Sequence, residues 1–313
     1  MAAHPRAQRR ERRLMTRLVL IEPFRAVFYA PYYVALEGGC FAQEGIEMVL
    51  ETAGTPDAAA GRLLDGTADL AWSGPMRPML ERARNPDSPL RSFGAAVMRD
   101  PFLLMGMGAR PDFRLADLAT LRVAIPSEVP TPWWCLNHDL RLAGIDPEAC
   151  PGHVRMPMPE GAAALLEGRV DAVMLFEPMA AALEEAGASQ WYAAASRGPT
   201  AYSALYATTT RIAERHAAFT AVVRGLGRAL AWLQTVEEAE VCALLAPRFA
   251  DVAPRHLVRA VARYRGLGLW DGTTHLPAPA LDWLAAAMVS AGAMTHHPGY
   301  ESCIDRSLDL VNP

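Results

Sequence analysis

The sequence predicts a two-lobed α/β protein, and three observations support this fold class. Short apolar segments alternate with helix-like segments, which is typical of parallel-rich sheets covered by helices. A unit made of a helix end, a glycine turn and an Asp-led strand occurs twice, at 63–70 and at 165–172. The length of 313 residues suits two domains better than one core. We expect one copy of the unit in each lobe. The alternative is that it is only the commonest turn from a helix to a buried strand.

The first third of the chain shows the alternation clearly. Its predicted elements are strands at 18–22, 46–51 and 69–72, and helices that begin at Pro31, Pro56 and Pro75. Glycines at 38 and 39 are typical of a helix end, and Thr55 is a favoured residue to cap the helix that follows it. Each predicted strand is therefore followed by a loop and then a helix.

Two strand-like segments then follow one another without a helix, at 92–98 and 102–107. The alternation resumes with strands at 121–125, around 154 and at 171–175, helices at 132–143 and 159–167, and a final extended segment at 204–208. The remaining chain is predicted to be almost entirely helical, at 217–233, 237–245, 254–264 and 278–290.

Composition excludes several classes of protein. The formal net charge of −4 is small for this length, so we expect no nucleic-acid partner. The basic residues from Arg6 to Arg17 are interpreted as a disordered arm covering residues 1–17, with a nucleic-acid or membrane arm as the lesser alternative. The five cysteines are scattered without ligand spacing, and His296 and His297 have no partner at such spacing. We predict no metal site, no cofactor and no disulfide.

The expected location is the cytoplasm. The apolar run at 18–21 is broken by Glu22, Pro23 and Arg25, so it does not form the uninterrupted apolar region of an export signal. No segment approaches the roughly 20 apolar residues of a membrane span, so we expect no membrane insertion. If the first residues of the chain are misassigned, an exported periplasmic protein becomes the alternative.

Several motifs resemble one family. These are Tyr29 to Ala35 followed by Gly39 to Ile46, both glycine turns, Asp117-Leu118 before 121–125, Phe176-Glu177-Pro178, and Gly292 ahead of Tyr300. In order and spacing they resemble type 2 periplasmic binding proteins, and more narrowly the NMT1/THI5-like group that includes sulfonate, nitrate and thiamin-pyrimidine binding proteins. The resemblance extends over nearly the whole chain from residue 18.

The resemblance implies a Venus-flytrap architecture with two parallel-rich sheets. Lobe I would comprise 15–104 plus 206–313, and lobe II would comprise 105–205. Hinge crossings would lie around Arg99-Asp100 and at 204–208. A small molecule would bind in the cleft between the lobes. An ABC permease would be a further partner if the protein is exported.

Candidate ligand-binding residues in the first lobe follow two of its strands, because ligands bind at the carboxyl ends of strands in such sheets. They are Phe24, Arg25, Phe28 and Tyr29 in one loop, Ser73, Gly74 and Arg77 in another, and Arg99 near a crossing. Three aromatic rings around one arginine suit a flat ring that bears an anionic or carbonyl group. Alternatively, Phe28 and Tyr29 pack on the helix beneath them, and Arg77 lies on the surface.

The second lobe contributes Ser127, Thr131, Trp133, Trp134 and Glu177 as candidates. In the family, the first of these loops is often rich in Gly, Ser and Thr, and its amides hold oxyanions. Here prolines remove amides and tryptophans add flat apolar surface, which favours an aromatic or heterocyclic ligand bearing an amino group or a carboxylate. Glu177 could accept hydrogen bonds from an amino group, or could be only a favourable charge at a helix start.

A binding protein is the leading interpretation, with no catalytic residue predicted, and an enzyme on the same fold is the alternative. The pyrimidine-forming THI5 enzymes use a Lys and a His near the second loop, where this chain has Ser73 and Arg77. Desulfinases of this fold use a cysteine in the first loop, and that loop has none here, while Cys135 resembles a core residue. An aromatic-acid decarboxylase remains open, with Arg25, Arg99 and Glu177 as its candidate groups.

Overall fold

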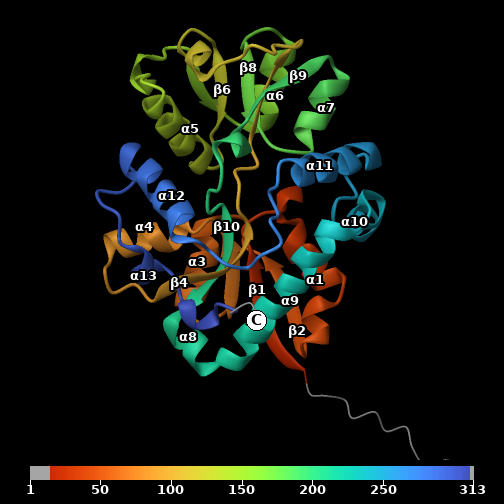
Figure 1. Cartoon of the computed structure of the whole chain (residues 1–313), viewed down its shortest axis with the longest axis vertical. Coiled ribbons are helices and arrows are strands. Elements are labelled where there is room, and N and C mark those ends of the chain that lie inside the picture. Colours follow the sequence, from red (N-terminus) through yellow and green to blue (C-terminus); the bar gives the residue numbers. More distant parts are fainter. Residues whose placement is uncertain (1–14, 311–313) are drawn as a thin grey trace, which may run out of the picture.

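The computed structural model describes residues 15–310 and consists of two lobes, each built around a five-stranded mixed sheet (Figure 1). The strands of the first sheet, in spatial order, are β2 (Ile46–Thr52), β1 (Thr16–Glu22), β3 (Leu70–Ser73), β10 (Ser203–Thr208) and β4 (Leu90–Val97). Those of the second are β7 (His153–Met156), β6 (Val123–Pro126), β8 (Ala172–Leu175), β5 (Leu103–Met107) and β9 (Ala188–Ala193). In each sheet one strand, β10 or β5, runs antiparallel to its neighbours, which confirms the parallel-rich prediction.

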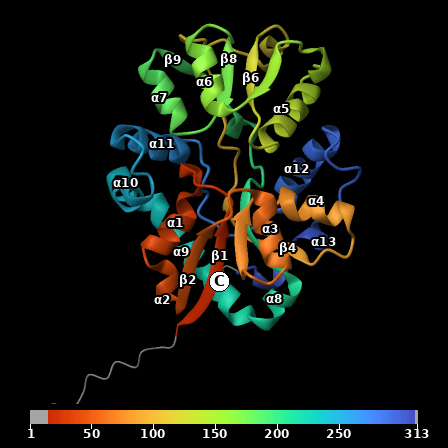
Figure 2. The ribbon, with the colours of Figure 1, turned by 180° about the vertical axis from the view of Figure 1, so that it is seen from behind.

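Of the α-helices within residues 15–310, three belong to the lobe of the second sheet, and the other ten surround the first. The second-lobe helices are α5 (Thr131–Leu142), α6 (Met158–Leu166) and α7 (Met179–Glu185). The first-lobe helices are α1 (Ala30–Glu37), α2 (Cys40–Gln43), α3 (Pro56–Leu64), α4 (Met76–Arg84), α8 (Thr209–Glu214), α9 (His216–Thr235), α10 (Glu238–Leu245), α11 (Pro254–Gly266), α12 (Ala278–Ser290) and α13 (Tyr300–Cys303). Both views place α7 against α11 on one side of the molecule, and α5 against α12 on the other (Figure 1, Figure 2).

The two lobes are joined by two backbone crossings that lie side by side. One runs through 98–102 and the other through 198–202. The amide of Thr200 donates to the carbonyl of Met98 at 2.8 Å, and the amide of Ala194 donates to the carbonyl of Phe102 at 2.9 Å. A paired crossing of this kind is a natural hinge between lobes.

The structure corrects two boundaries expected from the sequence. The segment 204–208, expected as a crossing, belongs to strand β10 (Ser203–Thr208) inside the first sheet, and the crossing precedes it. Of the predicted basic arm, residues 1–14 lie outside the described part of the chain, whereas Thr16 and Arg17 belong to β1. The carbonyl of Arg17 accepts a hydrogen bond from Nη2 of Arg215 at 2.8 Å. The predicted residue bounds of the two lobes stay a prediction.

The repeated helix–turn–strand unit has the same role in both lobes. The carboxylate of Asp69 accepts a hydrogen bond from the amide of Val19 at 2.7 Å, and that of Asp171 accepts one from the amide of Arg122 at 2.8 Å. In each lobe the aspartate thereby ties the start of its strand to the neighbouring strand. The turn glycine, Gly66 or Gly168, has a positive φ, which residues with a Cβ adopt only with strain.

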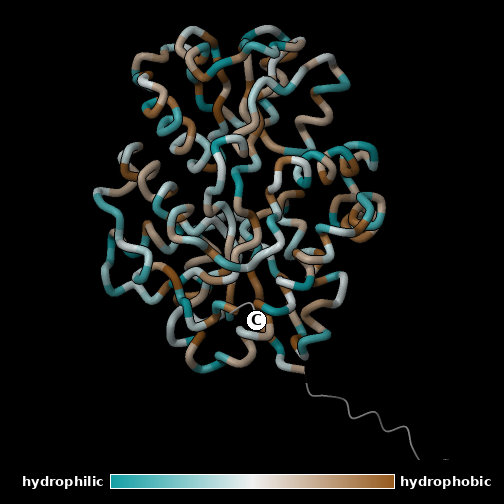
Figure 3. Tube along the Cα trace, in the orientation of Figure 1, coloured by the Kyte–Doolittle hydropathy of each residue, from teal (hydrophilic) through white to brown (hydrophobic). Residues whose placement is uncertain are grey.

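The hydrophobic core of the first lobe contains an aromatic stack. Trp72 of β3 is fully buried, and its ring lies parallel to that of Tyr32 with centroids 4.6 Å apart. Hydrophobic stretches follow the strands inside both lobes, and hydrophilic ones lie at the outer loops (Figure 3). Within residues 15–310, no helix has the length and apolar character needed to cross a membrane.

A glycine in α6, Gly161, lies where this helix packs closely on the second sheet. A Cβ at Gly161 would meet Cγ2 of Val173 at 2.9 Å and Cβ of Ala124 at 3.1 Å, whereas a Cβ at Gly61 in α3 would meet nothing within 4 Å. Gly161→Ala is therefore expected to lower the free energy of unfolding by about 1–3 kcal/mol. Gly61→Ala, its control, is expected to raise it by up to about 1 kcal/mol through helix propensity. Urea denaturation measures both, and equal effects would contradict the described packing.

Candidate functional site

A cavity of about 480 Å³ lies between the two lobes, at the edge where the parallel strands of both sheets end. Loops after β1, β2 and β3 form one wall, and loops after β6, β7 and β8 form the other. Phe102 and Tyr202 line it from the two crossings. The carboxyl ends of parallel strands are where open α/β sheets bind ligands, so this cavity is the candidate site.

The inner surface of the cavity is aromatic. Phe28 of the first lobe meets Phe176 of the second edge to face, with centroids 5.3 Å apart, and Phe102 meets Phe176 at 5.3 Å. Phe24 is only partly buried at the cavity wall, and its ring lies 6.4 Å from that of Phe28. The carbonyl of Phe28 accepts a hydrogen bond from Nε1 of Trp270 at 3.0 Å, which supports the wall from behind. Aromatic surfaces from both lobes therefore meet around the same space.

Two phenols add hydrogen-bonding groups to this surface. Tyr29 and Tyr202 line the cavity, and burial raises the pKa of each hydroxyl well above its ordinary value. Both hydroxyls are therefore neutral at physiological pH and able to donate a proton in a hydrogen bond.

Within residues 15–310, Arg77 is the one arginine that lines the cavity. It lies in the first turn of α4, is 7% exposed, and forms an ion pair through Nη1 with the carboxylate of Asp57 at the start of α3. Its Nε is buried without a hydrogen-bond partner among the described residues, while the Asp57 side chain is 76% exposed. The guanidinium therefore has spare donor capacity beside a carboxylate that water can solvate.

Across the cavity, the second lobe presents two polar side chains. Oε1 of Glu128 accepts a hydrogen bond from the amide of Met158 at 2.8 Å, which fixes the loop after β6. The hydroxyl of Thr131, at the start of α5, donates to the sulfur of Met76 in the first lobe. This last contact bridges the two walls.

The structure brings a subset of the predicted site residues together at this cavity, namely Phe24, Phe28, Tyr29, Ser73, Gly74, Arg77 and Thr131. Arg25 lies outside it and donates to the carbonyl of Arg248 at 2.7 Å. Arg99 also lies outside it and donates to the carbonyl of Ala195 at 3.0 Å. Both arginines hold connecting segments rather than the cavity wall.

Three predicted residues of the second lobe also lie away from the cavity. Ser127 is exposed. Trp133 packs edge to face on His153 with centroids 5.8 Å apart, and Trp134 packs against the hydrophobic cluster around α12. The tryptophans face away because α5 begins at Thr131, so only its first residue is turned toward the cleft.

Glu177 is fully buried and does not line the cavity. Its Oε1 lies 2.8 Å from Nη1 of Arg263, and its Oε2 accepts a hydrogen bond from the amide of Ala181 at 2.9 Å. Its amide donates to the hydroxyl of Tyr264 at 2.9 Å. Burial raises the pKa of this carboxyl, and Arg263 opposes that shift. The cavity wall is formed instead by its neighbour Phe176.

Cavity residues missed in the sequence include Thr55, Asp57, Phe102, Glu128, Met158, Phe176 and Tyr202. Thr55 and Asp57 could have been found from the sequence. Their loop follows β2, which is parallel to β1, so it lies at the same edge of the sheet as the loop of Phe28. Phe102 and Tyr202 gave no such signal, since they lie in the crossings between the lobes and not in loops that follow a parallel strand.

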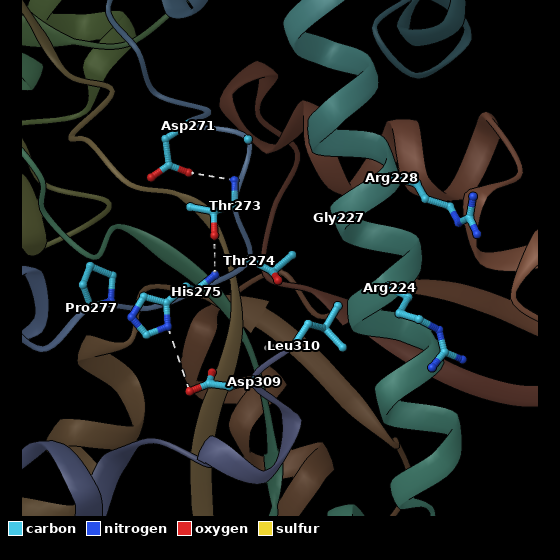
Figure 4. A pocket seen from close by; sticks show the side chains of 11 residues that line it. Arg224, Gly227, Arg228, Asp271, Thr273, Thr274, His275, Pro277, Asp309 and Leu310 are labelled. Carbon is cyan, nitrogen blue, oxygen red and sulfur yellow. Dashed lines mark hydrogen bonds and ion pairs between the residues drawn. The ribbon is translucent and has the colours of Figure 1, made fainter. Parts of the chain in front are cut away.

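A second pocket, of about 710 Å³, lies on the first lobe beside α9 (Figure 4). Arg224 and Arg228 of α9 form part of its lining, and each pairs with Glu44 at 2.8 Å. On its other side Nδ1 of His275 lies 3.9 Å from Asp309. In the close view the two arginines point away from that pair. Among residues 15–310, no group of three or more His, Cys, Asp or Glu is placed to hold a metal ion.

Known proteins share this architecture. YtlA of Bacillus subtilis (strain 168), named as a binding protein, is 21% identical over 300 residues, which cover 94% of this chain and 89% of YtlA. The periplasmic aliphatic sulphonate binding protein SsuA of Escherichia coli matches with a TM-score of 0.75 at 17% identity, over 94% of this chain and 98% of SsuA. A variant of DSZB in complex with biphenyl-2-sulfinic acid matches with a TM-score of 0.67 at 15% identity, over 94% of this chain and 97% of DSZB.

The structural likenesses show the two-lobed fold, and a family model shows more. The model described as NMT1/THI5-like matches residues 28–238. That stretch includes every cavity-lining residue except Phe24, together with both crossings. On this match, the chain belongs to the NMT1/THI5-like family.

Proposed function

We propose that this protein is a small-molecule binding protein of the solute-binding type, whose lobes close on one flat aromatic ligand that carries an anionic group. The observation that carries the proposal is the aromatic cavity between the lobes with Arg77 in its wall. The family, the fold and the named function of SsuA and YtlA support a binding role.

The aromatic part of the proposal rests on shape and surface. A volume of about 480 Å³ falls within the usual range of small-ligand pockets. Phe28 and Phe176 come from different lobes and touch each other in the cavity wall, so a ring that rests on this pair is contacted by both lobes. DSZB, of the same fold, is described in complex with the aromatic biphenyl-2-sulfinic acid.

The anionic part rests on Arg77. A guanidinium with an unpaired, buried Nε favours a carboxylate or sulfonate, and the exposed Asp57 side chain can turn to water when such a group arrives. Amino-bearing rings remain the alternative ligand, because Asp57 and Glu128 bring carboxylates to the same cavity. Glu177, the acceptor expected from the sequence, is engaged by Arg263 instead.

The alternative of an enzyme has one observation in its favour, the likeness to DSZB, which is named as a desulfurization enzyme. Against it, the three groups considered for a decarboxylase, Arg25, Arg99 and Glu177, do not line the cavity. Cys135 is fully buried, and burial raises the pKa of its thiol, which keeps it in the unreactive thiol form.

The cellular location of the protein determines which protein partner it would have. We retain the cytoplasmic location expected from the sequence, with a sensor as the matching type of binder. An exported protein would deliver its ligand to an ABC permease instead. Cell fractionation of the native host, with an antibody against the protein, tests the location.

A ligand screen by thermal shift tests the function directly. Aryl carboxylates, aryl sulfonates, alkyl sulfonates and aminopyrimidines are compared, hits are titrated by calorimetry, and each hit is recovered and examined by mass spectrometry. The proposal expects an aryl acid to bind tightest and to be recovered intact. Consumption of the hit would establish the enzyme instead, and a preference for alkyl sulfonates would contradict the aromatic ligand.

Substitutions at the Arg77–Asp57 pair test the anionic group. Arg77→Met is expected to weaken binding of the aryl acid about 10- to 100-fold, because a hydrogen bond to a charged group is lost. Asp57→Asn is expected to strengthen it, because the guanidinium loses its competing partner. The aryl amide serves as the uncharged control ligand in the same calorimetric titrations. Weaker binding of the acid by Asp57→Asn would favour the amino-bearing ring.

A matched pair of aromatic substitutions tests the cavity wall. Phe24→Ala is expected to weaken binding by about 0.5–1.5 kcal/mol, since one ring contact is removed. Trp133→Phe is expected to leave the dissociation constant unchanged, because Trp133 packs on His153 outside the cavity. If Trp133→Phe weakens binding as much as Phe24→Ala does, the ligand does not occupy this cavity.

A further inference from the structure

We propose that α7 and α11 form an ionic clasp that holds the two lobes closed in the absence of a ligand, with Glu177 as a positioning residue of this clasp. The clasp comprises Glu177, Glu184 and Glu185 of the second lobe with Arg255, His256, Arg259 and Arg263 of the first. Its effect on affinity rests on the proposed binding function, whereas its effect on lobe closure does not.

The inner part of the clasp is shielded from water. Arg263 contacts two carboxylates at once, with Nη1 2.8 Å from Oε1 of Glu177 and Nη2 2.7 Å from Oε1 of Glu184. Nε of Arg259 lies 2.7 Å from the other oxygen of Glu184. The side chains of Glu177, Arg263 and Glu184 are 0%, 13% and 14% exposed. Each of these contacts joins one lobe to the other.

The outer part is exposed and continues along the same helix. Arg255 contacts Glu185 through Nε and Nη2, and Nε2 of His256 lies 2.9 Å from Oε1 of Glu185. Arg255, Arg259 and Arg263 follow one another at intervals of four residues, so they share one face of α11. One face of a single helix therefore supplies all three arginines.

The opposite flank of the cleft is held differently. There α5 packs on α12, and the guanidinium of Arg197 lies 5.1 Å from the ring centre of Trp283. Arg197 itself pairs with Asp100 in the crossing and Asp139 in α5. Apart from the crossings, α5 and α12 are joined mainly by side-chain packing on Trp283, whereas α7 and α11 are joined by ion pairs between the lobes.

The ion pairs between α7 and α11 favour the closed arrangement of the lobes. A carboxylate as buried as Glu177 is stabilised only while its partner stays in place, because an unpaired charge away from water is unfavourable. Rotation of the lobes would separate Arg263 from Glu177 and Glu184 together. For a protein that binds in its closed form, the apparent dissociation constant is the intrinsic one divided by the closed fraction, so the clasp strengthens binding.

Small-angle X-ray scattering of the ligand-free protein tests the clasp. Glu184→Gln is expected to shift the ratio of closed to open molecules roughly thirtyfold toward the open form, seen as a larger radius of gyration. Arg122→Ala is the matched control, because it removes a 2.7 Å ion pair with Asp171 that lies within the second lobe. It is expected to leave the scattering unchanged. An unchanged radius for folded Glu184→Gln would overturn the proposal.

Exchanging the charges of the exposed pair Arg255–Glu185 distinguishes loss of the clasp from general destabilisation of the fold. Glu185→Arg and Arg255→Glu each place like charges together and should open the lobes, whereas the double variant should restore the compact radius. Arg259→Ala, at a side chain 56% exposed, replaces Glu184→Gln if that variant does not fold, as judged by circular dichroism. Failure of the double variant to restore closure would also count against the clasp.

Calorimetry on the same variants, with the tightest aryl acid from the screen, adds the effect on affinity. Weaker binding by Glu184→Gln, with Arg122→Ala unchanged, is expected. If Glu184→Gln has a larger radius of gyration but the screen identifies no ligand, the clasp is established and the proposed ligand is wrong. If every ligand-free variant keeps the compact radius of gyration and an aryl acid binds in calorimetry, the ligand is established and the clasp is wrong.

Discussion

The structure depends on the pairing of its two backbone crossings. The amide of Thr200 and the carbonyl of Met98 join the crossings at 2.8 Å, so both lobes are attached along one narrow line. From this line the parallel strands of each sheet run with their carboxyl ends toward the other lobe, and their loops form the two cavity walls. A loop that follows β3 can therefore meet one that follows β6, although the two are some fifty residues apart in the chain.

Ion pairs have different partners at two of the places where the lobes meet, the cavity and the flank of α7 and α11. In the cavity, Arg77 is balanced by Asp57 from the same lobe, so its pairing does not oppose the motion of one lobe against the other. On the flank, Arg263 is balanced by Glu177 and Glu184 from the other lobe. In the roles proposed above, the same residue types act in recognition at one place and in closure at the other, and the difference lies in whether the ionic partner comes from the same lobe.

Spacing and punctuation in the sequence were enough to predict the lobes, both glycine turns and the loops of Phe28 and Ser73, because these depend on short-range rules. Strand β9 was missed, since its sequence lacks the β-branched residues typical of strands. Glu177 was predicted to line the cavity, but its neighbour Phe176 does so. Successive side chains in extended backbone point in opposite directions, so an error of one position selects the wrong residue. The pairing of Glu177 with Arg263, 86 residues further along the chain, could be found only from the fold.

The hydrogen bond from Trp270 to the carbonyl of Phe28 has a consequence for how the two regions communicate. The ring of Trp270 also meets that of Tyr264 with centroids 6.1 Å apart, and the Tyr264 hydroxyl accepts the amide of Glu177. One buried indole thus lies between the aromatic wall and the clasp helix. Because the emission of an indole depends on its immediate surroundings, a change at either region is felt by this one of the seven tryptophans of the chain.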